Sequence, residues 1–531
     1  MSNSKLTPRG HRLWIPISLV ALAALGIATV QLQPEMDRNF KSWAESAIGL
    51  LTSLLVVLWF ALLSRVRWKP RLLTLALVGL AVFGLSKAVR VDGTVDGRGL
   101  PRLVWRWTEG PERQYTNRPA TNVIAEVKVD TKIAGAADVP QFFGPDRDGM
   151  VRGANLARDW NAQPPKELWR QAIGEGWSAF AVVQGKAFTQ EQRGDAELVS
   201  CYELLTGRLL WAHTNLVRFS EWQGGDGPRA TPTIHDGKVF AIGGTGILDC
   251  LDADDGHSLW SRDVLGENKL PNLTWGISGS PLVFGDVVVV TGGLTSGPTL
   301  LAYDCSSGKP LWAVGTDKSG YSSPILTTLA GRSVVLSVNA SSLTAHEPAT
   351  GKLLLNHPWA KDNWPKAAQP VVLGEDRVFI SAGYGMGCEL LKITVASDGQ
   401  LAAEVLWKNK MMKTQFNSAA ARDGFLFGLD DGLIACVDVA TGERKWKDGR
   451  YGSGQTLLVD DLILVQAERG FVALVVAKPD SYQELGRLAA LTSKTWNHPT
   501  LAGRYLLVRN DREAVCYELA TAPASVASGL R

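Results

Sequence analysis

A short frame of residues recurs through most of the chain after residue 200, and it constrains the fold more than any other feature. A small residue, Cys201, lies six positions before Gly207, and an acid, Glu203, lies four before it. A hydroxyl residue, Thr206, precedes this glycine, and Trp211 follows it by four. The same offsets recur around Gly256, Gly308, Gly351 (with Leu355 in the Trp place) and Gly442. A frame repeated at this spacing indicates a repeat architecture instead of several unrelated domains.

A second marker, a tight turn between two apolar strands, precedes each copy of the frame. Eight such turns, spaced 37 to 52 residues apart, fall at Gln184-Gly185, Asp236-Gly237, Gly285-Asp286, Ala330-Gly331, Glu375-Asp376, Asp423-Gly424, Asp460-Asp461 and Ala502-Gly503. Each unit therefore reads as four antiparallel strands, two joined by this turn and two joined by the turn of the glycine frame. Such units predict an all-β fold, an eight-bladed β-propeller of four-stranded blades.

The two ends of the repeat region predict how the propeller closes. The last unit stops after Cys516 and its strand, with no Trp strand behind it, whereas an unpaired Leu168-Trp169 strand precedes the first unit. We expect this N-terminal strand to complete the final blade, because a closed ring leaves no open sheet edge.

The frame residues themselves are interpreted as structural. Each Trp can pack beneath the next blade, and the acid and hydroxyl can cap the tight turn. Cys201, Cys250, Cys436 and Cys516 alternate with Ala at one frame position, so we expect small buried residues. No two cysteines are adjacent and no pattern predicts a metal site; the run Asp252–Gly256 is interpreted as a blade turn and not as a calcium loop.

The first ninety residues predict a membrane anchor. Three apolar runs, at about 13–32, 47–64 and 70–89, are long enough to cross a bilayer as helices. Residues 1–12 carry a charge of +3 and residues 65–71 carry +4, whereas the loop 33–46 between them carries −1. By the positive-inside rule, the rest of the chain lies outside the cytoplasm. The predicted domains are an anchor at 1–89, a linker at 90–140 and the propeller at 141–531.

Within the linker, the stretch LVWRWTEG contains Trp105 and Trp107 and has two alternative partners: the membrane interface, where Trp is favoured, or the propeller. Residues 72–531 carry a net charge of −3, so there is no overall electrostatic attraction to nucleic acid. That class of partner is excluded.

The frame Ala/Cys-x-Asp/Glu-x-x-Thr-Gly-x-x-x-Trp resembles the tryptophan-docking repeat of the pyrroloquinoline-quinone (PQQ) propeller superfamily. That superfamily includes eight-bladed quinoprotein alcohol dehydrogenases and the non-enzymatic propeller lipoprotein of the outer-membrane barrel-assembly machinery. The layout is also similar to bacterial membrane-anchored PQQ-like propellers, whose opening motif the segment QFFGPDRDG at 141–149 resembles. The resemblance implies a location on the periplasmic side of the bacterial inner membrane.

Strand order places the candidate site. The two kinds of tight turn share one face of the propeller, so the longer and more varied loops share the other, around the mouth of the central channel. A flat, tricarboxylated quinone would need aromatic faces and cations there. The candidate cofactor-binding residues are Trp177, Trp222, Arg229, Trp275, Tyr384, Lys413 and Trp496, and the catalytic candidates are Glu221, Asp226 and Arg229. In the alternative interpretation, Arg229 pairs with Asp226 in an ordered loop and the aromatic rings pack around it.

Two functions follow from this. The favoured one is a membrane-anchored scaffold or binding module for an extracytoplasmic protein partner, without catalysis or a cofactor. It is favoured because active PQQ alcohol dehydrogenases carry a vicinal disulfide over the cofactor, and this chain has no adjacent Cys pair. The alternative is a divergent quinoprotein dehydrogenase that uses PQQ with calcium to oxidise an alcohol or sugar at the membrane.

Overall fold

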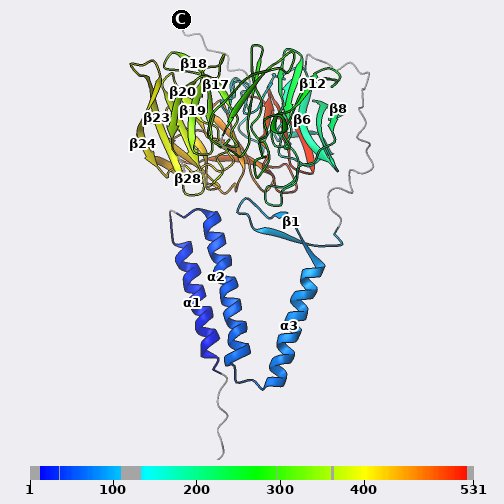
Figure 1. Ribbon diagram of the computed structural model, residues 1–531, viewed down its shortest axis with the longest axis vertical. Helices are drawn as coiled ribbons and strands as arrows, with labels where there is room; N and C mark the ends of the chain where they lie inside the picture. The colour runs from blue at the N-terminus through cyan, green and yellow to red at the C-terminus, as the bar shows by residue number, and fades with distance from the viewer. Residues whose placement is uncertain (1–11, 35, 109–132, 296, 360–363, 523–531) are drawn as a thin grey trace, which may run out of the picture. The chain divides into compact units, whose positions relative to one another are not determined.

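The computed structural model describes residues 12–34, 36–108, 133–295, 297–359 and 364–522. The chain divides into two compact units, Met1–Glu109 and Gly110–Arg531. The first is helical with one hairpin, and the second is a ring of β-sheets (Figure 1). The predicted fold class is confirmed in the second unit: its described strands form eight sheets, each with four antiparallel strands, and one of these sheets also carries a short fifth strand in parallel.

Within residues 12–34 and 36–108, the first unit has three helices that are long and apolar enough to cross a membrane. They are α1 (Trp14–Gln31), α2 (Arg38–Leu58), which continues as a π-helical turn at Trp59–Leu63, and α3 (Trp68–Ala88). Helix α2 includes the polar stretch 38–46, which a search for apolar runs does not identify. A hairpin of β1 (Val89–Thr94) and β2 (Pro101–Trp105) follows α3 directly, and the sequence did not predict it.

The strands of the first four blades have these bounds: β5 Ala181–Val183, β6 Lys186–Arg193, β7 Ala196–Glu203 and β8 Leu209–Asn215 in blade 1; β9 Thr233–His235, β10 Lys238–Ile242, β11 Ile247–Asp252 and β12 Ser258–Asp263 in blade 2; β13 Leu282–Phe284, β14 Val287–Thr291, β15 Leu300–Asp304 and β16 Pro310–Val314 in blade 3; β17 Ile325–Leu329, β18 Arg332–Val338, β19 Ser342–His346 and β20 Leu353–Pro358 in blade 4. A single helical turn, α4 (Val264–Glu267), follows blade 2.

The remaining blades follow the same order, except that the last strand of blade 8 comes from the start of the propeller: β21 Val371–Leu373, β22 Arg377–Ala382, β23 Gly387–Val395 and β24 Leu401–Asn409 in blade 5; β25 Ala420–Arg422, β26 Phe425–Asp430, β27 Leu433–Asp438 and β28 Arg444–Asp448 in blade 6; β29 Gln455–Val459, β30 Leu462–Gln466, β31 Phe471–Val476 and β32 Glu484–Ala489 in blade 7; β33 Thr500–Ala502, β34 Tyr505–Arg509, β35 Glu513–Glu518 and β4 Lys166–Ala172 in blade 8. Strand β4 pairs antiparallel with β35, which places Trp169 opposite Cys516. The predicted closure by an N-terminal strand is therefore confirmed.

The repeated Trp fastens each blade to the next, as the sequence predicts. The Trp211 ring lies over Gly256, where a Cβ atom would come within 2.4 Å of it, and its Nε1 donates a hydrogen bond to the Ala253 carbonyl oxygen at 3.3 Å. Equivalent indole-to-carbonyl bonds, between 2.8 and 3.2 Å, are made by Trp169, Trp260, Trp312, Trp407 and Trp446. The frame glycine is needed because the neighbouring ring occupies the space of a side chain and because its φ is positive, for example +75° at Gly256.

Around the channel, the residue that opens one blade bonds to the residue that opens the next. The Thr231 backbone N–H donates to Ser280 Oγ at 2.9 Å, and the Ser280 N–H donates to Ser323 Oγ at 2.9 Å. The Gln369 N–H donates likewise to Ser418 Oγ at 3.0 Å. Small hydroxyl residues at these positions thus connect blades 2, 3 and 4 and blades 5 and 6 near the channel.

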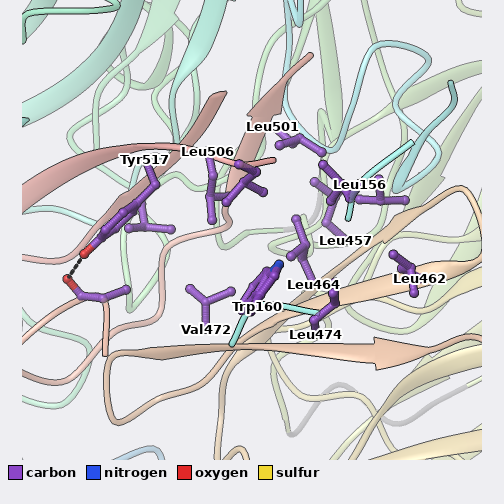
Figure 2. Close-up of a cluster of buried hydrophobic side chains, with 14 of the residues drawn as sticks. Leu156, Trp160, Leu457, Leu462, Leu464, Val472, Leu474, Leu501, Leu506 and Tyr517 are labelled. Carbon is purple, nitrogen blue, oxygen red and sulfur yellow. Dashed lines mark hydrogen bonds between the residues drawn. The ribbon is translucent and has the colours of Figure 1, made fainter. Parts of the chain in front are cut away.

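The main apolar clusters lie between neighbouring blades. Figure 2 shows the one between blades 7 and 8, where Leu464 and Leu474 face Leu506 and Tyr517. Trp160, from the segment before β4, completes this cluster. All six cysteines are free and buried, which confirms the interpretation of Cys201, Cys250, Cys436 and Cys516 as small core residues.

Candidate functional site

Five of the seven cofactor-binding candidates meet around one loop, residues 216–229 between β8 and β9, which we call the 216–229 loop. Trp177 Nε1 donates to the Gly224 carbonyl oxygen at 2.5 Å. A Cβ atom at Gly224 would lie 2.8 Å from Trp275 and 3.2 Å from the Arg229 guanidinium. The fourth, Trp496, has its ring 4.9 Å from the Trp177 ring, and the fifth, Trp222, lies in the loop itself.

The other two candidates lie on blades 5 and 6. Tyr384 stacks on Trp364 at 5.1 Å with their planes 6° apart, and Lys413 is buried, with its backbone N–H donating to Asp430 at 3.0 Å. They are separate from the contacts that surround Gly224.

The polar candidates of the 216–229 loop bond to the loop itself. The Glu221 carboxylate accepts the backbone N–H groups of Gln223 at 2.9 Å and Gly224 at 2.6 Å. The Arg229 guanidinium donates to the carbonyl oxygens of Gly225, at 2.5 Å, and Gly227. These bonds fix the course of the loop, because each one closes a turn of only a few residues.

Asp226 does not form the expected ion pair with Arg229. Its carboxylate binds Arg218 at 2.6 Å and accepts a hydrogen bond from Ser220 Oγ at 2.8 Å. Arg229 instead lies over the Phe219 ring at 4.4 Å. The sequence missed Arg218 and Phe219 because pairing by proximity along the chain favours the nearest opposite charge, whereas the loop folds back on itself.

Burial changes the acidity of two groups at this site. Loss of water lowers the pKa of the Arg229 guanidinium to about 10, although the nearby Glu197 carboxylate counteracts this effect. Burial raises the pKa of Glu197, which accepts hydrogen bonds from Gly244 N and Thr245 Oγ1, both at 3.0 Å. Glu197 thus holds the glycine-rich loop 243–246 beside the 216–229 loop, a role that its place inside β7 did not suggest.

The aromatic candidates are also engaged with each other. Trp177 and Trp496 pack with their ring planes at 44°, and Lys494 Nζ lies over both, at 5.5 and 4.0 Å from the ring centres. Trp496 Nε1 donates to Glu468 at 2.8 Å. A flat tricarboxylate such as PQQ needs an open slot between rings and cations facing it. In this arrangement Trp177 and Trp496 pack on each other and Arg229 is bound by carbonyl oxygens, so these residues do not fit PQQ.

The opening motif at 141–149 connects the first strands of blades 1 and 7 and contacts the residues just before the first strand of blade 3. Val139 pairs with Val182 of β5, and the chain returns as β3 (Met150–Val151), which lies parallel to β29. Between these points Arg147, which is 5% exposed, donates to the carbonyl oxygens of Ser280 at 2.6 Å and Pro281 at 2.9 Å. The motif therefore links three blades that are distant in the sequence.

The glycines of this motif have a steric role. A Cβ atom at Gly149 would lie 2.5 Å from the Phe143 ring, and Gly149 has a φ of +76°. Beside the motif, a pocket of about 380 Å³ is lined by the edges of blades 4 to 6 and by Arg147, Arg152, Arg377 and Arg422.

Asp252, Asp255 and His257 bring three potential ligand atoms within 4.8 Å of one another on the turn of blade 2. Asp252 accepts the Asp254 backbone N–H at 2.8 Å, and Asp255 accepts the His257 N–H at 2.9 Å and its Nδ1 at 2.6 Å. These bonds are those of a capped turn, the interpretation that the sequence favours.

His498 provides a test of the packing around the channel. It is buried against the rings of Phe142 and Phe143, and its two nitrogens face the carbonyl oxygens of Pro499 and Thr456. Burial lowers its pKa to about 4, although both carbonyl groups favour the charged form. The unfolded chain, with a His pKa near 6.5, therefore binds more protons than the folded protein between pH 4 and 6.5.

We expect the free energy of unfolding to be about 2 kcal/mol smaller at pH 5 than at pH 7 because of His498. The stabilisation is fully present above pH 6.5 and is lost as the pH falls towards 4. Urea unfolding of the wild type and of His498→Gln at several pH values measures this. Between pH 7 and pH 5, the free energy of unfolding should fall by about 2 kcal/mol less in the variant than in the wild type. The same pH dependence in the two proteins would contradict the prediction.

Comparisons with known proteins agree with this architecture. The family model described as "Outer membrane protein assembly factor BamB" matches residues 153–264 and 195–448, together more than half of the chain. The curated relatives include proteins of that name from Shewanella oneidensis, 24% identical over 59% of this chain and 89% of the relative, and from Burkholderia pseudomallei, 24% identical over 65% and 85%.

Solved structures show the same fold at low identity. BamB from Moraxella catarrhalis superposes with a TM-score of 0.50 and 17% identity, over 68% of this chain and 99% of that one. A europium-containing methanol dehydrogenase superposes with a TM-score of 0.56 and 12% identity, over 73% and 99%. A single fold therefore serves an assembly factor and an oxidoreductase, and it does not decide between them. The family match does settle membership: this chain belongs to the PQQ-like propeller family described as outer membrane protein assembly factor BamB.

Proposed function

We propose that this protein is a binding module, held in the bacterial inner membrane by its three helices, whose propeller binds a protein partner on the periplasmic side without catalysis. The curated relatives are assembly factors by name. We infer a role of the same class, in which the 216–229 loop contacts another protein of the cell envelope.

One observation carries this proposal. The acid and guanidinium groups of the 216–229 loop form hydrogen bonds and ion pairs within the loop itself, whereas two of its large apolar side chains are exposed. Trp222 is 53% exposed and Leu216 is 88% exposed. A rigid loop that presents an exposed Trp has the properties of a protein-binding anchor, because the aromatic ring buries a large area while little conformational entropy is lost.

The charge pattern supports the orientation. The basic segments 1–12 and 65–71 lie on one side of a three-span anchor, and a membrane protein keeps such segments in the cytoplasm. The chain after α3 then begins on the opposite side of the membrane.

Site-specific photo-crosslinking tests the proposal. A benzophenone amino acid is placed at Trp222 of the full chain, in cells that express the protein natively, and adducts are identified by mass spectrometry after irradiation. We expect one discrete protein adduct, because the loop presents this position to the partner. The matched control is Lys352, an exposed residue on a tight turn of blade 4, which should give no such adduct.

The dehydrogenase alternative is tested on the same full chain in detergent. PQQ is titrated in the presence of calcium, and dye-linked oxidation of alcohols and sugars is assayed. We expect no turnover. Saturable PQQ binding with turnover that requires Asp226 and Arg229 would overturn the binding-module proposal, as would the same adduct from positions 222 and 352.

A further inference from the structure

The β1–β2 hairpin has its apolar face outward. In the register of the hairpin, Val89 lies opposite Trp105 and Val91 lies opposite Leu103, so these four side chains share one face. Leu103 is 64% exposed and Trp105 is 48% exposed, while Arg102 and Val104 on the opposite face are partly buried. A hairpin in water normally exposes its polar face, so the exposed apolar face of this hairpin indicates contact with an apolar environment.

The exposed face is extended by a second indole. Trp107 stacks on Trp105, with ring centres 5.1 Å apart and planes 9° apart, and it is 70% exposed. The result is an exposed apolar surface of two indole rings, Leu103 and Val91. An isolated two-stranded hairpin is only marginally stable in water, so this surface needs a partner.

Both ends of the hairpin are tied to helix ends at the same membrane surface. At one end β1 continues from α3 without a linker, and the Arg106 backbone N–H donates to the Ala88 carbonyl oxygen at 2.8 Å. At the other end the turn of the hairpin reaches the start of α2, where Trp43 Nε1 donates to the Arg98 carbonyl oxygen at 2.8 Å. Because α2 and α3 are consecutive spans, the start of one and the end of the other lie on one side of the bilayer.

The charged side chains of the hairpin are placed as a position at the membrane surface requires. On the opposite face, Arg102 forms an ion pair with Asp92, so these two charges do not face the lipid unpaired. Arg106 is exposed next to the indole pair, where a guanidinium can reach lipid phosphates while the rings contact the acyl chains.

We propose that the β1–β2 hairpin lies flat on the periplasmic surface of the bilayer, with Val91, Leu103, Trp105 and Trp107 inserted among the lipids at the headgroup level. The partner is lipid because the hairpin is covalently continuous with a span and bonded to a second one. This inference rests on the proposed membrane anchor.

Spin labelling of the full chain in vesicles of phosphatidylethanolamine and phosphatidylglycerol tests the inference. All six native cysteines are buried, so a nitroxide attaches selectively to a new surface cysteine. Three single variants are compared: Leu103→Cys on the apolar face, Val104→Cys on the opposite face, and Val78→Cys in the middle of α3. Accessibility is measured to oxygen, which partitions into lipid, and to a water-soluble nickel chelate.

We expect the label at position 103 to be several-fold more accessible to oxygen than to nickel, as at position 78, and the label at 104 to show a lower ratio. Equal nickel accessibility at 103 and 104, with lipid exposure at 78, would overturn the hairpin inference and leave the anchor intact. Protection of position 103 from both reagents would also overturn it, because a protein surface would then cover the face. Nickel accessibility at 78 would contradict the anchor itself.

Discussion

Replacement of Trp211 by alanine should lower the free energy of unfolding by about 3–5 kcal/mol, the usual range for a buried Trp. This ring is 2% exposed, packs on Gly256 of the next blade, and loses its hydrogen bond to the Ala253 carbonyl oxygen when it is removed. The ring packs between the sheets of blades 1 and 2, so its removal leaves a cavity in that cluster. Urea unfolding of the full chain in detergent, followed by near-ultraviolet circular dichroism, measures the effect.

The matched control is Trp222→Ala. The substitution is the same, Trp to Ala, but the Trp222 ring is half exposed on the 216–229 loop. The free energy of unfolding should therefore change by no more than about 0.5 kcal/mol. The pair separates the two uses of Trp in this protein, packing between blades and presentation to a partner. A similar loss in both variants would contradict the assignment of Trp222 to the surface.

Replacement of Arg509 by methionine should destabilise the propeller by about 3–5 kcal/mol, because it leaves buried carbonyl groups without a donor. Arg509 lies in β34 of the last blade and is fully buried. Its guanidinium donates to Thr189 Oγ1 at 2.8 Å and to the Gln190 carbonyl oxygen at 2.7 Å, both in β6 of the first blade, and to the Gly174 carbonyl oxygen at 2.9 Å. Arg509 therefore joins blade 8 to blade 1 at the seam, the contact between the last and first blades where the ring closes.

The control for this variant is Arg208→Met. Arg208 is partly exposed on a tight turn of blade 1, where it pairs with Glu203 at 3.2 Å, and such surface pairs contribute between zero and about 1 kcal/mol. Limited proteolysis gives a second readout, since a weakened seam should expose β4 and β35 to cleavage before the other blades. Equal stability of the two variants would show that the closure does not depend on Arg509.

Much of the fold could be predicted from the sequence because the same local residue pattern recurs in most blades. The glycine frame fixes a turn, and the Trp four positions later reaches the neighbouring turn, so contacts between blades repeat at a constant distance along the chain. The hairpin β1–β2 was not predicted, and its turn is bonded to Trp43 of α2, which lies far away in sequence. The path of the 141–149 motif could not be predicted either, because it depends on contacts with distant residues: Arg147 donates to the carbonyl oxygens of Ser280 and Pro281.

The candidate site could be predicted only in part. Five of the seven residues chosen from the sequence lie in or beside the 216–229 loop, and three of them surround Gly224. It could not assign their partners, because the hydrogen bonds of a loop depend on how the loop folds back. Asp226 binds Arg218 and not Arg229, whose guanidinium donates to a loop carbonyl oxygen. These residues therefore stabilise the loop.

The sequence by itself thus determined the number of blades, their closure by an N-terminal strand, and three apolar helices before them, because these features arise from short-range patterns that repeat. The tertiary structure alone decided which polar groups are already bonded, which Trp rings are exposed, and which face of the hairpin is apolar. Those properties depend on contacts between residues that are distant in the chain, and a local pattern carries no information about them.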